Sequence, residues 1–429
     1  MKNLILAGAL LCSFSMASAQ TETETKVSSE PVYVANTGSS SHSSSSSTAR
    51  RVVQRNTDTQ NGDDPMRSKN FSKSFSLSPS DKINLHNQYG GMVIKVWDKK
   101  EVKIDVSIKA FSNDEKEAQR LIDQVDISAE KDGDQVTCKT SIGSGSRWSG
   151  RGRRREVKVN YVVYLPATNS LTLTQEFGNV NMDDFAGPLY AKVQYGDFIA
   201  GKLSSVNNYV SVQYGKTTIT DINKAVIKQQ YGSGLTIGAA GTLDLNAQYV
   251  TVRINTIRGD AFIKQQYGSG ISITNVNNLD LDIQYANVRV DNIKGNAIIK
   301  QQYNNIKIGT VGRLDLKSQY ANVEIGALRG DGFFKMSYNN FDIVEVGAGC
   351  RNLNIDADYV DTKLKFAEGF NGDYNVQTSY SGFKSGERVA VRQAGSQDDD
   401  NTKNYTGKIG SGGRVAVRIK SDYGSVTFR

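Results

Sequence analysis

Few residues of this chain have side chains suited to catalysis. Only 2 His and 3 Cys occur among 429 residues, so the usual catalytic bases, thiol nucleophiles and His/Cys metal ligands are scarce. Carboxylates stand two apart at Asp280 and Asp282, and again at Asp356 and Asp358. On a β-strand both members of such a pair face the same way, and a carboxylate pair can hydrolyse glycosidic bonds. The chain contains a repeat, described below, whose other copies carry Asn, Lys or Gln at the positions of these carboxylates. Such variation is typical of a solvent-exposed face. We therefore expect no catalytic, cofactor-binding or metal-binding residues, with a polysaccharide-cleaving enzyme as an alternative.

The densest positive charge is the run Arg-Trp-Ser-Gly-Arg-Gly-Arg-Arg-Arg at 147–155, which contains Arg151, Arg153, Arg154 and Arg155. The formal net charge of +8 is mild for this length and does not require nucleic acid. Two interpretations stay open for the run. It is either a solvated hairpin tip or a contact for an anionic envelope polymer or lipid head group.

The residues that carry a pattern are tyrosines at intervals of 17 to 21 residues. The series comprises Phe177, Tyr195, Tyr214, Tyr231, Tyr249, Tyr267, Tyr285, Tyr303, Tyr320, Tyr338, Tyr359 and Tyr380, with outlying members at Tyr89 and Tyr423. A fixed period of this size is typical of a solenoid, whose repeats bury their apolar faces only by stacking on their neighbours.

Apolar and polar residues alternate on both sides of each Tyr, as in 225–231 and 235–237, which indicates strand rather than helix. The fold class predicted is all-β, a right-handed parallel β-helix with coils of about 18 residues. The left-handed form would need hexapeptide repeats that the chain lacks. Continuing the alternation to the Tyr puts its ring on the core side, near a corner of the coil.

A second repeat of 36 residues lies over the first, because Ala-x-Ile-Lys-Gln-Gln-Tyr recurs from Ala225, Ala261 and Ala297. The outward positions of these and neighbouring coils include Lys228, Lys264, Lys300, Lys335, Gln230, Gln266 and Gln302. Two interpretations fit these columns. Amide ladders and mixed charges stabilise stacked strands, and the same columns would also form a carbohydrate-binding surface.

Composition divides the chain into five segments. Residues 1–19 read as a secretory signal peptide, with Lys2, an apolar run from Leu4 and the cleavage-site residues Ala17-Ser18-Ala19. Residues 20–68 are Ser-rich and predict a disordered tether. Residues 69–165 predict an α+β cap with a first coil and a helix over 114–125 capped by Ser112 or Asn113. The repeats cover 166–385, and 386–429 should close the far end.

Export implies a location in the periplasm, at the outer membrane or on the cell surface, and no membrane-spanning segment is expected in the mature chain. Cys138 and Cys350 would be the two thiols left after cleavage. In an oxidising compartment they could pair or stay as two buried free thiols.

Several short motifs resemble one family. They are Leu85-His86-Asn87-Gln88-Tyr89-Gly90-Gly91-Met92-Val93-Ile94, Val163-Tyr164-Leu165-Pro166, Gly178-Asn179-Val180, Gly410-Ser411-Gly412 and Tyr423-Gly424-Ser425-Val426. Over residues 70–429 the chain is similar to secreted adhesin-like proteins of unknown function that are common in Bacteroidota. The resemblance implies an exported β-solenoid and brings no catalytic residues.

The function predicted is therefore non-enzymatic. An exported, adhesin-like solenoid would present an extended surface to an envelope polymer, a glycan or a protein partner, and not to nucleic acid. The alternatives are a structural or regulatory envelope-stress protein with a membrane partner, and the polysaccharide-active enzyme.

Overall fold

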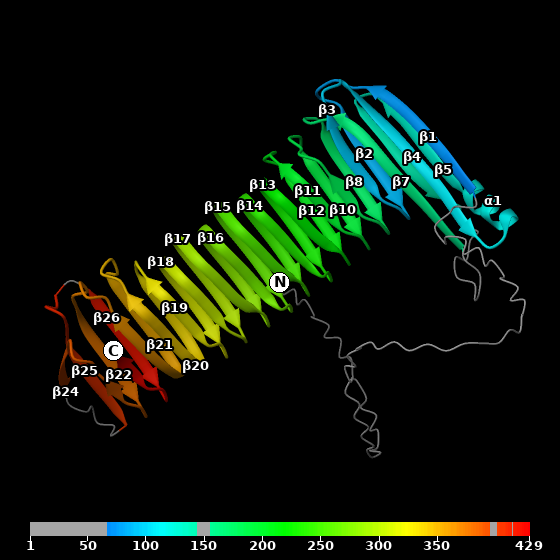
Figure 1. The fold of residues 1–429 in the computed structure, drawn as a ribbon. Coiled ribbons are helices and arrows are strands. Elements are labelled where there is room, and N and C mark those ends of the chain that lie inside the picture. The colour runs from blue at the N-terminus through cyan, green and yellow to red at the C-terminus, as the bar shows by residue number, and fades with distance from the viewer. Residues whose placement is uncertain (1–66, 144–154, 395–400, 414) are drawn as a thin grey trace, which may run out of the picture. The chain divides into compact units, whose positions relative to one another are not determined.

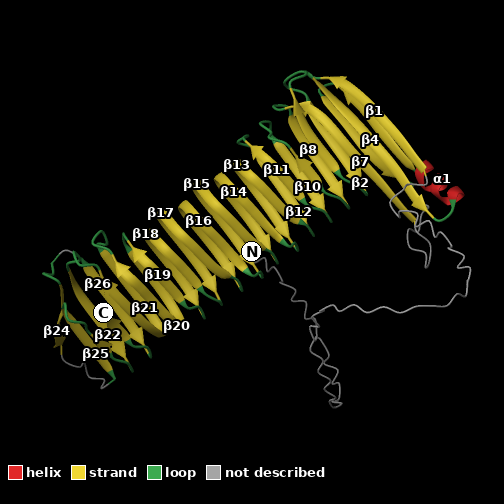
Figure 2. Ribbon diagram, viewed as in Figure 1, coloured by secondary structure: helices red, strands yellow, loops and turns green. Residues whose placement is uncertain are grey.

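The computed structural model describes residues 67–143, 155–394, 401–413 and 415–429. The expected signal peptide, residues 20–66 of the expected tether and most of the basic run lie outside the described residues, whereas Arg67 and Ser68, the last two residues expected in the tether, begin a strand of the cap, β1 (Arg67–Ser76). Within the described residues, strands stack side by side along the whole described chain and a single helix lies near one end (Figures 1 and 2). The predicted fold class is confirmed in its main features, a parallel β-solenoid with coils of about 18 residues and a small α+β N-terminal cap.

Each coil consists of two strand segments that meet at the recurring Tyr, here called the corner. In one coil, β10 (Leu189–Gln194) precedes the corner at Tyr195 and β11 (Phe198–Leu203) follows it. β10 pairs in parallel with β8 and β12, whereas β11 pairs with β9 and β13. The segments before the corners therefore form one sheet, the pre-corner sheet, and the segments after them form the post-corner sheet.

The middle coils are continuous, because the segment after one corner runs on into the segment before the next as a single bent strand. The solenoid strands other than β10 and β11 are β8 (Ser170–Glu176), β9 (Val180–Met182), β12 (Asn208–Gln213), β13 (Lys216–Gln230), β14 (Gly234–Gln248), β15 (Thr251–Gln266), β16 (Gly270–Gln284), β17 (Asn287–Gln302), β18 (Ile306–Gln319), β19 (Val323–Leu328), β20 (Gly332–Val346) and β21 (Asn352–Phe366).

The core lies between the two sheets and is one line of aliphatic side chains per coil. Ile227 of the pre-corner sheet and Leu235 and Ile237 of the post-corner sheet are almost wholly buried. Gln265, two residues before its corner, also points inward and donates its side-chain amide to the carbonyls of Val250 (3.0 Å) and Gly270 (3.3 Å). Such buried amides provide partners for the backbone carbonyls of the corners, which strand pairing leaves unused.

The corner tyrosines do not point into the core, so the orientation expected from alternation is wrong. Every corner residue has φ between 50° and 65°. A left-handed residue breaks the alternation of the strand and turns its side chain outward. All the corner rings except that of Tyr89 are 38–56% exposed.

The corner rings stack on one another in a continuous ladder. Successive centroids are 4.6–5.3 Å apart and the planes are inclined by 2–12°. In spatial order the ladder is Tyr89, Phe177, Tyr195, Tyr214, Tyr231, Tyr249, Tyr267, Tyr285, Tyr303, Tyr320, Tyr338, Tyr359, Tyr423 and Tyr380. A left-handed residue with a Cβ costs about 1–2 kcal/mol, and each aromatic pair returns about 0.5–1.5 kcal/mol. Stacking therefore offsets the backbone strain.

Replacing one ladder residue should separate ring stacking from hydroxyl bonding. We expect Tyr249→Ala to lower the free energy of unfolding by about 1–3 kcal/mol, since it keeps the left-handed backbone and removes two stacked pairs. Tyr249→Phe should stay within about 0.5 kcal/mol of the parent chain, because Phe177 already occupies the ladder without a hydroxyl. Urea unfolding measures both variants. Equal losses of unfolding free energy in the two variants would show that the tyrosine hydroxyl groups, and not the stacked rings, provide the stability.

The N-terminal cap continues both sheets past the first coil. That coil is β2 (Lys82–Gln88) and β3 (Met92–Trp97), stacked on β8 and β9. The pre-corner sheet continues through β6 (Gln135–Ile142) and β5 (Val125–Asp132), and the post-corner sheet through β7 (Arg155–Pro166), β4 (Glu101–Ser112) and β1 (Arg67–Ser76).

Helix α1 (Glu115–Asp123) packs against β4, β1 and β7 through Ala118, Leu121 and Ile122. Its N-cap is Asp114, whose carboxylate accepts the backbone N–H of Lys116 at 2.8 Å. The predicted cap residues, Ser112 and Asn113, therefore precede the true N-cap.

At the other end the last strands of the chain insert between two earlier coils. β22 (Gly372–Ser379) and β23 (Phe383–Lys384) are followed by the antiparallel pair β24 (Val389–Ala394) and β25 (Thr402–Ile409). β26 (Ala416–Asp422) then pairs with both β21 and β22, and β27 (Val426–Phe428) pairs with both β21 and β23. The terminal coil thus lies between its two predecessors.

Candidate functional site

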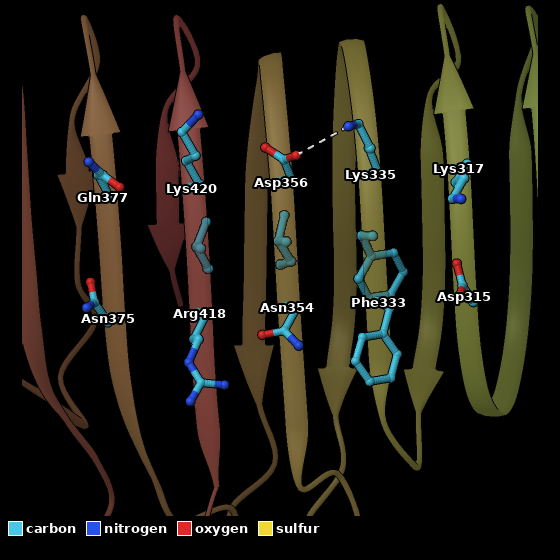
Figure 3. A pocket seen from close by; sticks show the side chains of 13 residues that line it. Asp315, Lys317, Phe333, Lys335, Asn354, Asp356, Asn375, Gln377, Arg418 and Lys420 are labelled. Carbon is cyan, nitrogen blue, oxygen red and sulfur yellow. Dashed lines mark ion pairs between the residues drawn. The ribbon is translucent and has the colours of Figure 1, made fainter.

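Three hollows lie on the outer face of the pre-corner sheet, here called the pre-corner face. The hollow nearest the C-terminus, of about 480 Å³, is lined by side chains of β18, β20, β21, β22 and β26 (Figure 3). The next, of about 390 Å³, lies over β16, β17, β18 and β20, and the third, of about 360 Å³, over β10, β12 and β13. Larger hollows of about 570 and 750 Å³ lie at the corner of Tyr267 and near Arg388, but three hollows in a row along one sheet make this face the candidate binding surface.

The pre-corner face carries three columns of outward side chains, at one, three and five residues before each corner. The parallel pairs keep strict register here, so that Lys264 lies opposite Asn246 on one side and Asp282 on the other. Equivalent side chains therefore repeat at the strand spacing of about 4.8 Å. Any ligand lying along the columns meets the same position once per coil.

The column nearest the corner is an amide ladder. Gln230 accepts a hydrogen bond from Gln213 at 2.8 Å and donates to Gln248 at 3.0 Å. Gln266 likewise accepts from Gln248 (3.5 Å) and donates to Gln284 (3.3 Å), which pairs in register with Gln302. These hydrogen bonds form the amide ladder that the stacking interpretation of the Gln column expects.

The second column contains the predicted lysines, and its charges pair in one place. Lys335 Nζ lies 3.8 Å from Asp356 Oδ2 (Figure 3). Lys228 lies over the ring of Tyr209, with its ammonium 5.8 Å from the ring centroid. Lys264 and Lys300 are exposed and form no ion pair with any described residue. Their ammonium groups are therefore free to meet a ligand.

The third column was missed by the sequence reasoning and is apolar in the three coils that carry the Ala-x-Ile-Lys motif. Val226, Phe262 and Ile298 are 39%, 52% and 48% exposed. Each stands two residues before Lys228, Lys264 or Lys300, and so points to the same side of the strand. The signal was the second residue of the Ala-x-Ile-Lys motif, which is apolar although its position points outward.

Of the arginine cluster, the structure describes only Arg155, which lies away from the pre-corner face. Arg151, Arg153 and Arg154 lie outside the described residues. Arg155 is half-buried at the start of β7, where its Nε lies 3.3 Å from Oε1 of Glu117 in α1. The structure therefore puts the described part of the cluster in the N-terminal cap, in an ion pair.

The carboxylates and thiols form no metal-binding cluster within the described part of the chain. Those residues hold no group of three or more His, Cys, Asp or Glu arranged to bind a metal ion. Cys138 and Cys350 are both buried and are not bonded to each other. Burial raises the pKa of Cys138 to about 11 and that of Cys350 to about 12, so neither thiol ionises readily.

Two Arg-Gly-Asp sequences, a tripeptide of the integrin-binding type, occur at 258–260 within β15 and at 329–331 between β19 and β20, and the fold uses both. Arg258 pairs with Asp221 at 2.7 Å, and Asp260 accepts a hydrogen bond from Asn278 at 2.8 Å. Asp331 accepts the backbone N–H of Arg351 at 2.9 Å. These contacts join one coil to another, which explains the residue types without a receptor.

As for membranes, the described residues contain no helix of the length and apolarity that crossing a bilayer needs.

Comparisons with known proteins give distant likenesses. No family model and no curated protein matches the chain. A "putative adhesin" from Parabacteroides merdae is 13% identical over 62% of this chain and 95% of its own, with a TM-score of 0.24. A "putative cell adhesion protein" from Clostridium sporogenes is 9% identical (84% and 99% covered, TM-score 0.18), and a "putative lipid binding protein" from Parabacteroides distasonis is 12% identical (84% and 96%, TM-score 0.19). Two of these descriptions agree in kind with the adhesin-like family that the sequence motifs resemble, but likenesses this weak carry no argument about what the chain binds.

Proposed function

We propose that the protein is an exported, non-enzymatic binding protein, adhesin-like, whose pre-corner face holds an extended carbohydrate polymer of a cell envelope. The observation that carries the proposal is that an exposed apolar side chain stands two residues before a lysine in every second coil of this face, as in Phe262 with Lys264 and Ile298 with Lys300. Export itself is proposed from the leader at residues 1–19.

The side chains suit a carbohydrate better than a compact ligand. Sugar rings offer apolar C–H faces and polar rims. Phe262 and Ile298 can pack against such faces, while Lys264, Lys300 and the edge of the Gln ladder meet the hydroxyl and carboxylate groups. The hollows are shallow and repeat along the face, whereas small-molecule sites are usually single and enclosed. A polymer gains affinity from many weak, repeated contacts of this kind.

Binding without turnover is proposed because the paired carboxylates share one strand. Glycoside hydrolysis needs two carboxyl groups that flank the scissile bond. Asp280 and Asp282 both project from β16 onto the same open face, and the column of Asp282 is filled by Asn246 and Lys317 in the neighbouring Asp-bearing coils, as a binding column of mixed side chains would be.

The test uses the full chain on a glycan array, followed by calorimetry on any polymer that binds. The double change Lys264→Gln with Lys300→Gln should weaken binding by about tenfold or more, since it removes two charge-assisted contacts. Lys363→Gln, an exposed lysine of the post-corner sheet, is the matched control and should bind as the parent does. Equal binding by all three proteins would contradict the proposal. New reducing ends that vanish in Asp280→Asn would show that the protein is an enzyme.

A further inference from the structure

We infer that the polymer bound by the pre-corner face is a linear acidic polysaccharide in which charged and uncharged sugars alternate, lying along the stacking direction. The inference rests on the proposed function and narrows its ligand class.

The pre-corner face alternates between two kinds of coil. One kind, here called a Lys row, carries an apolar side chain followed two residues later by Lys. The Lys rows are Tyr190 with Lys192, Val226 with Lys228, Phe262 with Lys264, Ile298 with Lys300, and Phe333 with Lys335.

The other kind, here called an Asp row, carries Asp where the Lys row has its apolar side chain. The Asp rows are Asp244 with Asn246, Asp280 with Asp282, and Asp315 with Lys317. From Val226 to Phe333 the two kinds alternate at every coil, whereas the coil between Tyr190 and Val226 carries Tyr209 and Ser211.

The alternation sets a spacing for the ligand. Successive corner rings at Tyr249, Tyr267 and Tyr285 are 5.1 Å apart in both steps, so two coils advance by about 10 Å, twice the parallel strand spacing. One sugar of an extended polysaccharide advances by nearly one coil, and a disaccharide by nearly two. A polymer along the columns can therefore keep each kind of sugar opposite one kind of row.

The side chains of the two kinds of row indicate which sugars of the ligand carry a negative charge. In a Lys row the ammonium of Lys264 can bind a carboxylate or sulfate while Phe262 packs against the ring of the same sugar. In an Asp row the carboxylates of Asp280 and Asp282 accept hydrogen bonds from hydroxyl groups and repel anions. A ligand with one negative charge per disaccharide satisfies both kinds of row from Val226 to Ile298, whereas the Asp row of Asp315 also carries Lys317 between Lys300 and Lys335.

The Asp rows also discriminate against other anionic polymers. Nucleic acids and polyuronates carry a charge on every unit, which would bring an anion opposite an Asp row, such as that of Asp280 and Asp282, at every second coil, and a contact between like charges is a means of rejecting a partner. An uncharged polysaccharide leaves the lysines of the Lys rows without counter-charges.

Three probes of equal length test the charge pattern on the full chain. Hyaluronan oligosaccharides carry a carboxylate on alternate sugars, oligogalacturonate on every sugar, and chitin oligomers on none. We expect hyaluronan to bind about tenfold more tightly than either of the others, with affinity rising for each added disaccharide. Lys363→Gln again serves as the control outside the face.

Variants within the face test the rows themselves. Lys264→Gln should weaken hyaluronan binding by about tenfold, whereas Lys317→Gln, in the same column but in an Asp row without an apolar neighbour, should cost clearly less. The pair Asp280→Asn with Asp282→Asn should raise the affinity for oligogalacturonate. Calorimetry and circular dichroism report binding and correct folding of each variant.

The outcomes separate the inference from the function on which it rests. Oligogalacturonate or chitin binding as tightly as hyaluronan, or equal losses in Lys264→Gln and Lys317→Gln, would overturn the alternating-charge ligand while leaving carbohydrate binding in place. Binding of none of the three probes, together with a silent glycan array, would overturn both.

Discussion

A chain that ends after Gly413 is expected to lose the structure of its C-terminal end. Such a chain lacks β26 and β27, whose Val417, Ile419, Val426 and Phe428 are almost wholly buried. Burying four side chains of this size contributes on the order of 10 kcal/mol. Because β26 lies between β21 and β22, its removal also leaves the coil at 372–384 without a parallel neighbour and exposes an edge of β21, which promotes aggregation.

Hydrogen exchange and limited proteolysis of the shortened chain check this expectation. Amides of residues 372–409 should exchange within the dead time and proteases should cut there, while the coils around Tyr249 stay protected. A chain that ends after Phe428 is the control, since it loses Arg429 with its ion pair to Asp342 at 2.9 Å and its backbone N–H bond to the carbonyl of Leu364 at 2.8 Å, but keeps β26 and β27. Normal protection of 372–409 in the chain ending at Gly413 would mean that β22 docks on β21 without the inserted coil.

The second large effect is expected for Gly196→Ala, at a residue directly after a corner. A Cβ built on Gly196 would lie 1.9 Å from the carbonyl oxygen of Gly178 in the coil before, and one on Gly215 would lie 1.8 Å from that of Gly196. Real Cβ atoms never approach so closely, and the obstructing atom belongs to the backbone, so the two coils must separate. We expect a loss of about 3 kcal/mol or more.

Urea unfolding compares Gly196→Ala with Gly382→Ala. A Cβ on Gly382 meets no atom within 4 Å, and its backbone is not left-handed, so that variant should match the parent or gain about 0.5 kcal/mol. Similar unfolding midpoints for the two variants would show that the coils tolerate local separation.

The period of the tyrosines was enough to predict a stacked-coil β fold, because a coil cannot change length without breaking the register of every strand above it. It did not predict the direction of the rings. Alternation through Ile227 and Gln229 continues inward to Tyr231, but φ at Tyr231 is 50°, and a left-handed tyrosine is not expected from residue type. The stacking that compensates for it involves neighbouring coils and is invisible within one repeat.

The inserted terminal coil was equally beyond sequence reasoning. Tyr380 follows Tyr359 in the chain, but the ring of Tyr423 stacks on both, at 4.7 and 4.8 Å. Spacing along the chain carries no information on this order. For the candidate site, the repeat singles out Lys264 and Lys300, whereas Phe262 and Ile298 carry a weaker signal, because single exposed apolar residues are common on protein surfaces.

The alternation of Lys rows and Asp rows also limits how such a chain can grow by duplication. One extra coil would bring two rows of the same kind together and shift every later row against its ligand. A duplication of two coils, 36 residues in this repeat, restores the phase and lengthens the surface by one ligand repeat. The duplicated unit of this surface is therefore a pair of coils. Chains of different length built from this unit would bind the same polymer over segments of different length.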